Sequence, residues 1–207
     1  MLVLIAYPPS AGGNHLKNIL CLDNSFANSI DLNIKKVYYE NQGAKIGEVQ
    51  SIPGRNVHEH FIDQVCQDID SDYVLQCHFG EIANYRDRIF DLEKKLILLT
   101  IDDFTDRIIL EKRQNRLGQH IHPYWLEEEL LFLYQPEMYV RYFGISKNNI
   151  MSLPVHHFWK SDLETHSIID RVNQFLNKQI PKKQAQDLHD RWQEINYYPY
   201  RLYQVDQ

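Results

Sequence analysis

The first residues whose types and spacing could do chemistry lie in a glycine-containing loop near the start of the chain. An apolar run at 2–6 is followed by a turn cluster at 8–13, and a helical pattern then begins. A strand, a glycine loop and a helix in this order are typical of an anion site, because backbone N–H groups and the helix dipole favour negative charge there. The candidate anion contacts are Ser10, Ala11, Gly12, Gly13 and Asn14.

An ordinary tight turn is the alternative interpretation of this loop. Glycine lets the backbone turn and approach closely because it has no Cβ, so Gly12 and Gly13 can be explained without a ligand. The loop also lacks the Gly-Lys-Ser or Gly-Lys-Thr sequence of the usual nucleoside-triphosphate loop. The pattern alone leaves both interpretations open.

Three further side chains could act on a bound anion or on an acceptor. His78 ends the apolar segment 73–79, and an imidazole titrates near neutral pH, which suits a general base. A strand-end histidine bonded to a backbone carbonyl is the alternative. Lys17 lies one helical turn after Gly13 and could reach back to the anion, as could His15. A solvated surface position is the simpler interpretation of Lys17.

The helix expected at 106–116 carries a basic face. Arg107 and Arg113 could bind a phosphate, because the guanidinium fork matches phosphate oxygens. A solvated helix face, balanced by Asp106 and Glu111, is the alternative.

Histidine pairs at 58/60, 120/122 and 156/157 raise the question of a metal. Residues two apart on a helix do not face each other, so the first pair is a poor set of co-ligands. No carboxylate or cysteine at a suitable spacing completes a site, and no metal is expected.

Hydrophobic periodicity predicts strands that alternate with helices. Strands are expected at 2–6, 73–79, 95–101 and 149–155. Helices are expected at 14–27, 57–69, 81–90, 106–116, 163–176 and 182–195, with one or two more between 120 and 142. This alternation predicts a three-layer α/β fold with a mainly parallel sheet flanked by helices. In such sheets ligands lie beyond the carboxyl ends of the strands, where the glycine loop and His78 fall.

Length and composition limit the class of protein. The 207 residues predict a single domain at 1–207 with an aromatic tail from about 196, and a hydrophobic fraction of 43% is enough for a core. A net charge of −6 argues against nucleic acid or an anionic membrane as partner. No apolar run approaches the roughly 20 residues of a membrane helix. Three cysteines without a metal pattern are expected as reduced thiols of a cytoplasmic protein.

Three stretches together resemble the sulfotransferase family. The loop Tyr7-Pro-Pro-Ser-Ala-Gly-Gly-Asn-His-Leu16 resembles the family's Tyr-Pro-Lys-Ser-Gly-Thr-Thr-Trp-Leu. Gln76-Cys-His-Phe79 is similar to the family's Lys-Thr-His-Leu. The run Ser161-Asp-Leu-Glu, with the later Ile169-Asp-Arg-Val-Asn-Gln-Phe-Leu176, is similar to its Glu-Asp-Leu and the helix ending in Phe-Leu-Gly. The resemblance reaches from Met1 to about Asn177.

The resemblance implies a P-loop-NTPase-like fold and sulfuryl transfer. The donor would be 3′-phosphoadenosine 5′-phosphosulfate, held by its 5′-phosphosulfate at the loop, and the acceptor would be a hydroxyl or amine on a small molecule or glycan. The histidine of the second motif is the family's catalytic base, which matches His78 here. Arg107 and Arg113 are the candidates for the donor's 3′-phosphate.

Two positions depart from the family's pattern. Pro9 stands where the family has a loop lysine, and the segment after the third predicted strand lacks the family's arginine and serine for the 3′-phosphate. Two other functions therefore stay open beside a sulfotransferase. One is a non-catalytic P-loop-like protein that binds a nucleotide or phosphate, and the other is a small-molecule kinase.

Overall fold

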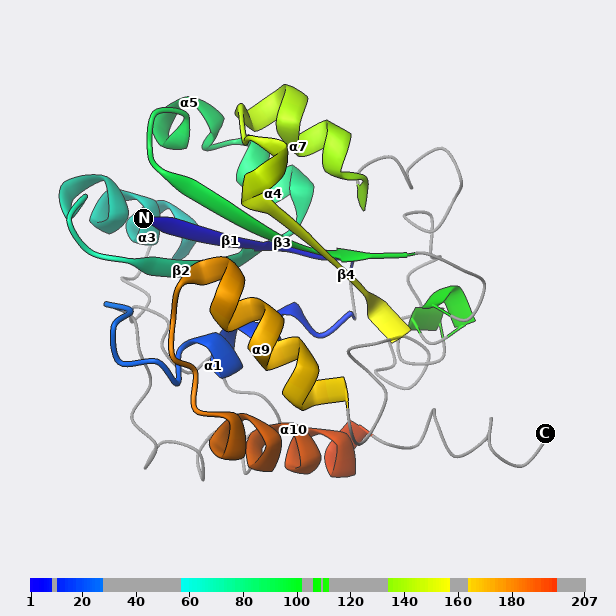
Figure 1. Ribbon diagram of the computed structural model, residues 1–207. Coiled ribbons are helices and arrows are strands. Elements are labelled where there is room, and N and C mark those ends of the chain that lie inside the picture. The colour runs from blue at the N-terminus through cyan, green and yellow to red at the C-terminus, as the bar shows by residue number, and fades with distance from the viewer. Residues whose placement is uncertain are drawn as a thin grey trace.

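A four-stranded parallel sheet forms the centre of the molecule (Figure 1). The computed structural model describes residues 1–8, 11–27, 57–101, 106–108, 110–111, 134–156 and 164–196. The strands are β1 (Leu2–Ala6), β2 (Tyr73–Cys77), β3 (Lys94–Thr100) and β4 (Ile150–Pro154), in the order β2-β1-β3-β4. All three pairings are parallel, so the expected α/β class with a parallel sheet is confirmed.

The strands form where the chain is apolar over short runs. β1 is buried along its whole length, because β2 and β3 flank it and helices cover both faces. Its register places Leu4 opposite Leu75 of β2 and Leu96 of β3. In the described part of the chain β4 is an edge strand, and its last residue, Pro154, pairs with Thr100. Proline has no backbone N–H, so an edge or a strand end is where a sheet tolerates it.

Helices cover the two faces of the sheet and complete three layers (Figure 1). One face packs against α1 (Gly13–Leu20), α9 (Glu164–Leu176) and α10 (Lys182–Asn196). The other face packs against α3 (Val57–Gln67), α4 (Phe79–Ala83), α5 (Arg86–Ile89) and α7 (Pro136–Phe143). A short 3-10 turn, η4 (Lys147–Asn149), leads into β4. Because successive strand residues point to opposite faces, Val3 and Ile5 join the first core and Leu2 and Leu4 the second.

The first predicted helix is shorter than its apolar pattern suggested. It ends at Leu20 rather than near residue 27. The carboxylate of Asp23 accepts a hydrogen bond from the backbone N–H of Ser25 at 2.8 Å, and such a local bond competes with the helix ladder. The chain then extends, and Phe26 forms a bridge with Asp72 beside β2.

Two other predicted elements need correction. The helix expected at 81–90 is two short helices, α4 and α5, separated at Tyr85. The strand expected at 73–79 ends at Cys77, so His78 lies just beyond it. Of the one or two helices expected between 120 and 142, α7 occupies the described residues from 136 onwards. Residues 112–133, which include the end of the helix expected at 106–116, and the aromatic tail beyond residue 196 lie outside the described residues. Where the structure describes the chain, no helix has the length and apolar character needed to cross a membrane.

Candidate functional site

The strand order places the glycine loop at a change of direction in the sheet. From β1 the chain reaches β2 on one side, and then crosses to β3 on the other side of β1. In open parallel sheets, ligands bind outside the carboxyl ends of the strands at such a switch point. The loop that follows β1 begins there, with Tyr7 and Pro8.

The backbone of this loop leads into α1 without a side-chain cap. Gly12 is the N-cap residue and lies in the left-handed region, with φ 92° and ψ 21°. The backbone N–H of Ala11 bonds to the carbonyl of Pro8 at 3.1 Å, and the helical bonding starts with Leu16 N–H to the Gly12 carbonyl at 3.0 Å. The N–H groups of the first helical turn precede this bond and receive no side-chain cap. A helix N-terminus with uncapped N–H groups is suited to binding an anion, because these groups and the helix dipole attract negative charge.

Gly13 is required by the close approach of Tyr7. A Cβ at Gly13 would lie 2.0 Å from the Tyr7 ring, so the ring occupies the space that any larger residue would need. The Tyr7 hydroxyl also donates to Oδ1 of Asn14 at 3.1 Å. Tyr7 therefore fixes the first turn of α1, and packing alone accounts for the glycine at position 13.

His78 is tied to the same tyrosine through the backbone. Its Nδ1 lies 2.9 Å from the carbonyl oxygen of Tyr7, and the two rings are 4.6 Å apart between centroids. A carbonyl oxygen only accepts, so Nδ1 carries the hydrogen. The neutral ring then has its lone pair on Nε2, as a general base requires. The structure thus brings together His78, Tyr7, Gly13 and Asn14.

His15 points into the core instead of the loop. It is 1% exposed, and its ring stacks on Trp192 of α10 with centroids 4.2 Å apart and planes 5° apart. Its Nε2 lies 3.2 Å from Nδ1 of His189. These contacts tie α1 to α10, so the described contacts of His15 are structural.

Lys17 is buried at 4% exposure, and its interpretation as a solvated surface lysine is wrong. Burial raises the pKa of the Cys21 thiol to about 12, although the positive charge of Lys17 acts in the opposite direction. A buried lysine thus lies one turn after Gly13, on the same short helix as the uncapped end.

The predicted arginines are only partly covered by the structure. Arg107 is half-buried in a helical turn that follows β3, whereas Arg113 and Ser10 lie outside the described residues. Nothing in the described contacts joins Arg107 to the loop of β1.

The sequence reasoning missed the contact between Asp106, in the helical turn that follows β3, and His156, which lies just after β4. Asp106 is fully buried and accepts hydrogen bonds from the backbone N–H of His156 at 2.6 Å and from its Nδ1 at 3.1 Å. Asp106 had been assigned only to a solvated helix face. Asp106 is separated from Thr100, the end of β3, by residues 101–105, so no local pattern signalled its contact with His156.

Thr100 is a further polar group at the carboxyl end of the sheet, where the position of its strand predicts ligand binding. It ends β3, is 5% exposed, and within the described part of the chain its hydroxyl has no hydrogen-bond partner. Because Ala6 pairs with Leu98, Thr100 lies two residues beyond the end of β1, beside the switch point. An unpaired buried hydroxyl is costly, so this position is suited to a ligand or water.

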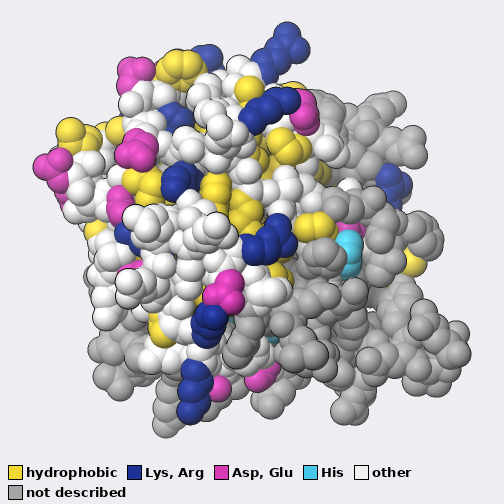
Figure 2. Space-filling model, in the orientation of Figure 1, with side chains coloured by type: hydrophobic (Ala, Val, Ile, Leu, Met, Phe, Trp, Pro, Cys, Tyr) yellow, Lys and Arg dark blue, Asp and Glu magenta, His cyan; other side chains and the backbone are white. Residues whose placement is uncertain are grey.

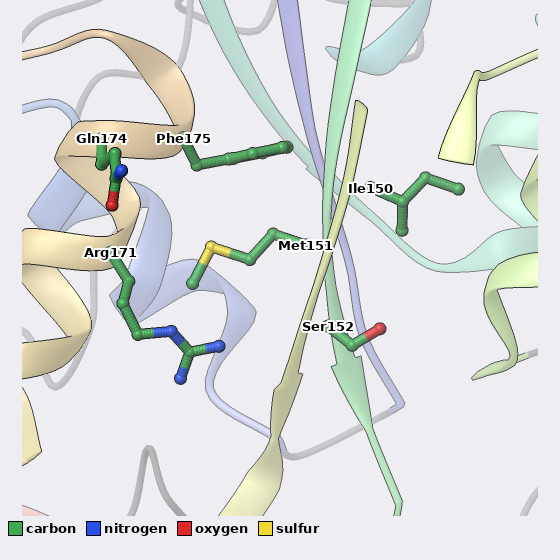
Figure 3. A pocket seen from close by; sticks show the side chains of 6 residues that line it. All are labelled: Ile150, Met151, Ser152, Arg171, Gln174 and Phe175. Carbon is green, nitrogen blue, oxygen red and sulfur yellow. The ribbon is translucent and has the colours of Figure 1, made fainter. Parts of the chain in front are cut away.

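The hollow shown in Figure 3 lies away from these groups. It has a volume of about 440 Å³ and runs between the β4 edge and α9. Met151 and Phe175 point into the space between strand and helix, while Ile150 and Ser152 point to the other side of the strand. No predicted site residue lines it. Among the described residues, no cluster of three or more histidine, cysteine or acidic side chains could hold a metal ion.

Comparisons with protein-family models, with curated proteins and with solved structures found no match for this chain. Its function must therefore be inferred from the residues themselves.

Proposed function

We propose that the chain transfers a sulfuryl group from 3′-phosphoadenosine 5′-phosphosulfate to a hydroxyl or amine of a small molecule or glycan. The observation that carries the proposal is the bond between Nδ1 of His78 and the Tyr7 carbonyl at 2.9 Å. It holds a base-competent imidazole beside the uncapped start of α1, which suits the donor's 5′-phosphosulfate.

The chemical step is an in-line displacement at sulfur. Nε2 of His78 takes the proton of the acceptor hydroxyl while the acceptor oxygen forms a bond to sulfur. The bond between sulfur and the bridging phosphate oxygen breaks, and the electron pair stays on that oxygen. The products are the sulfated acceptor and 3′-phosphoadenosine 5′-phosphate, and positioning with charge stabilisation supplies most of the catalysis.

The donor's negative charge needs cations, and the family's loop lysine is replaced by Pro9. Lys17 is the candidate for this charge, because it is a buried cation on the helix that follows the loop. Arg107 and Arg113 remain the candidates for the 3′-phosphate. His15 is left out of this proposal, since its ring is stacked on Trp192.

Calorimetric titration distinguishes the proposal from a kinase. The folded chain is titrated with 3′-phosphoadenosine 5′-phosphate and, in parallel, with ATP and Mg²⁺. Binding of the first ligand alone is expected. If only ATP with Mg²⁺ binds, the result favours a kinase. If neither ligand binds, both the sulfotransferase and the kinase functions are excluded.

A non-catalytic nucleotide-binding or phosphate-binding protein is the second candidate. The observation that favours it is that both loop glycines have structural roles, one in the left-handed region and one beneath Tyr7, so the loop needs no reaction to explain it. The donor is incubated with a panel of phenols, amines and sugars, and release of 3′-phosphoadenosine 5′-phosphate is followed by chromatography. Binding without release supports this second candidate.

A further inference from the structure

Helices α5 and α7, on one face of the sheet, form an arginine–aromatic surface. It comprises Arg86, Phe90, Met138, Arg141 and Tyr142, from α5, the residue after it, and α7. Phe90 and Tyr142 are 43% and 37% exposed, and they are two of the three large hydrophobic side chains exposed among the described residues. Over these upper helices, Figure 2 shows Lys and Arg side chains adjoining hydrophobic ones.

A hollow lies within this surface. It has a volume of about 390 Å³ and is lined by Arg86, Met138, Arg141 and Tyr142. Two guanidinium groups and an aromatic ring thus converge with a flexible apolar side chain. Arginine, tyrosine, phenylalanine and methionine are the residues enriched where proteins bind one another.

Arg86 is held in place before any partner arrives. Its guanidinium lies 5.1 Å from the Phe90 ring centroid and 5.2 Å from that of Tyr142. Its Nε donates to the Tyr142 carbonyl at 2.6 Å, which also links α5 to α7. A side chain that is already ordered loses less entropy on binding, so its contacts contribute more to affinity.

The surface has positive charge that the fold does not neutralise. Asp87 pairs with Arg86 at 3.0 Å, but the aspartate is 91% exposed, and exposed pairs of this kind are weak. Arg141 has no ion pair or hydrogen bond with any residue that the structure describes. Two guanidinium groups can therefore accept carboxylates from outside.

We propose that the arginine–aromatic surface docks an acidic segment of a partner protein. Two carboxylates of the segment pair with Arg86 and Arg141, and an apolar side chain between them rests on Met138 and Tyr142. Charge complementarity favours an acidic peptide over nucleic acid. Nucleic-acid binding draws on many phosphate contacts, whereas the hollow offers two guanidinium groups, of Arg86 and Arg141.

The surface is separate from the loop of β1. α5 leads into the amino end of β3, and α7 leads through η4 into the amino end of β4. The candidate site for sulfuryl transfer lies at the opposite, carboxyl ends. The two sites share no residue, although the Tyr142 ring contacts that of Phe79, the residue after His78, at 5.6 Å between centroids. The docking proposal does not depend on the chemistry.

An array of short fluorescent peptides tests the docking proposal on the full chain. Each peptide places two glutamates and one phenylalanine or leucine in a serine–glycine background, with every spacing represented, and matched peptides carry lysine instead of glutamate. Fluorescence anisotropy is expected to show binding to a subset of acidic peptides and none to the lysine set. Arg141→Glu should weaken that binding roughly tenfold or more, and Tyr142→Ala by a similar factor.

A matched variant and two competing ligands make the test decisive. Arg171→Glu reverses a charge in the groove beside β4 and should leave peptide binding unchanged. Lysine peptides should bind Arg141→Glu better than they bind the original chain. The proposal is overturned if no acidic peptide binds, or if Arg171→Glu loses as much peptide affinity as Arg141→Glu. It is also overturned if the chain prefers phenyl phosphate or single-stranded DNA to the acidic peptides. Circular dichroism checks that the variants are folded.

Discussion

The two ends of the parallel sheet are held in different ways. At the amino end, Asp72 lies just before β2 and pairs with Nζ of Lys178 at 2.6 Å and with the amino group of Met1 at 2.9 Å. Lys178 also donates to the Ser25 hydroxyl at 2.7 Å. Nearby, Nζ of Lys94 donates to the carbonyls of Ile89 and Leu92, both at 2.8 Å. Asp72 and Lys178 thus join distant parts of the chain at this end, and Lys94 closes the turn that leads into β3.

At the carboxyl end of the sheet, hydrogen bonds hold polar side chains in fixed orientations. His78 is fixed by one backbone carbonyl, and the start of α1 has no side-chain cap. The buried carboxylate of Asp106 positions His156. Paired charges at one end stabilise the fold, while titratable rings at the other end keep groups available for a ligand. Side chains that could act on a ligand are therefore expected at the carboxyl end of the sheet.

The largest expected effect is the loss of sulfuryl transfer in His78→Ala. General-base catalysis contributes roughly 10²–10⁴-fold, so release of 3′-phosphoadenosine 5′-phosphate should slow by that factor. Affinity for this product, measured by calorimetry, should be unchanged. Asp72→Asn, at the other end of the sheet, should keep the original turnover. Equal turnover in His78→Ala and the original chain would remove His78 from the mechanism.

Gly13→Ala is expected to destabilise the carboxyl end through overlap with Tyr7. The new Cβ would lie 2.0 Å from the ring, and forcing atoms into a packed site costs roughly 1–3 kcal/mol. Urea unfolding measures the change in the free energy of unfolding. Adding Tyr7→Leu should recover part of the loss, because the smaller side chain leaves room. An unchanged midpoint in Gly13→Ala would contradict the described packing of Tyr7.

Asp72→Asn tests the amino end through its pH dependence. Burial raises the pKa of the Asp72 carboxyl, but hydrogen bonds and charges from Lys178 and the Met1 amino group outweigh it and hold the pKa below its usual value. The carboxylate therefore stabilises the fold above the ordinary aspartate pKa of about 3.9, and this contribution is lost as pH falls through the folded-state pKa.

At neutral pH the Asp72→Asn variant should lose roughly 1–2 kcal/mol of unfolding free energy, since bonds to charged groups are the stronger ones. The difference from the original chain should shrink as the pH falls below about 3.9. Thermal unfolding at several pH values measures it. A difference that stays constant with pH would show that charge is not the cause.

The smallest expected effect comes from His15→Phe. The phenyl ring keeps the stack on Trp192 but loses the contact with His189, so the free energy of unfolding should fall by roughly 0.5–1.5 kcal/mol. Donor affinity should not change, because His15 contacts α10. A clear loss of donor affinity in calorimetry, with stability intact, would return His15 to the anion site.

Local sequence pattern predicted the strands well because each is a short apolar run. The strand at 2–6 matches β1, and the predicted segments at 95–101 and 149–155 differ from β3 and β4 by one residue at each end. The helix end at Leu20 was missed, because the Asp23 carboxylate accepts hydrogen bonds from the backbone N–H groups of Ser25 and the distant Gln179, which apolar periodicity does not report.

The sequence predicted only those parts of the candidate site that follow from the positions of the strands along the chain. The end of β1, the end of β2 and His78 follow from strand positions, since parallel strands place their carboxyl ends together. The direction in which a side chain points cannot be predicted from the strand positions. His15 and His189 are far apart in sequence yet in contact, and Lys17 is buried although lysine is usually exposed. Such contacts depend on how helices pack, which short motifs do not encode.

Pro154 has a consequence for copies of the chain that meet at high concentration. An exposed edge strand can pair with the edge strand of another copy through its N–H and carbonyl groups, and sheets grow into aggregates in this way. Proline offers no N–H at the last position of β4, so an incoming strand finds the hydrogen-bond ladder interrupted there. Among the described strands, this residue interrupts the ladder at the carboxyl end of the β4 edge, which disfavours pairing with a further strand there.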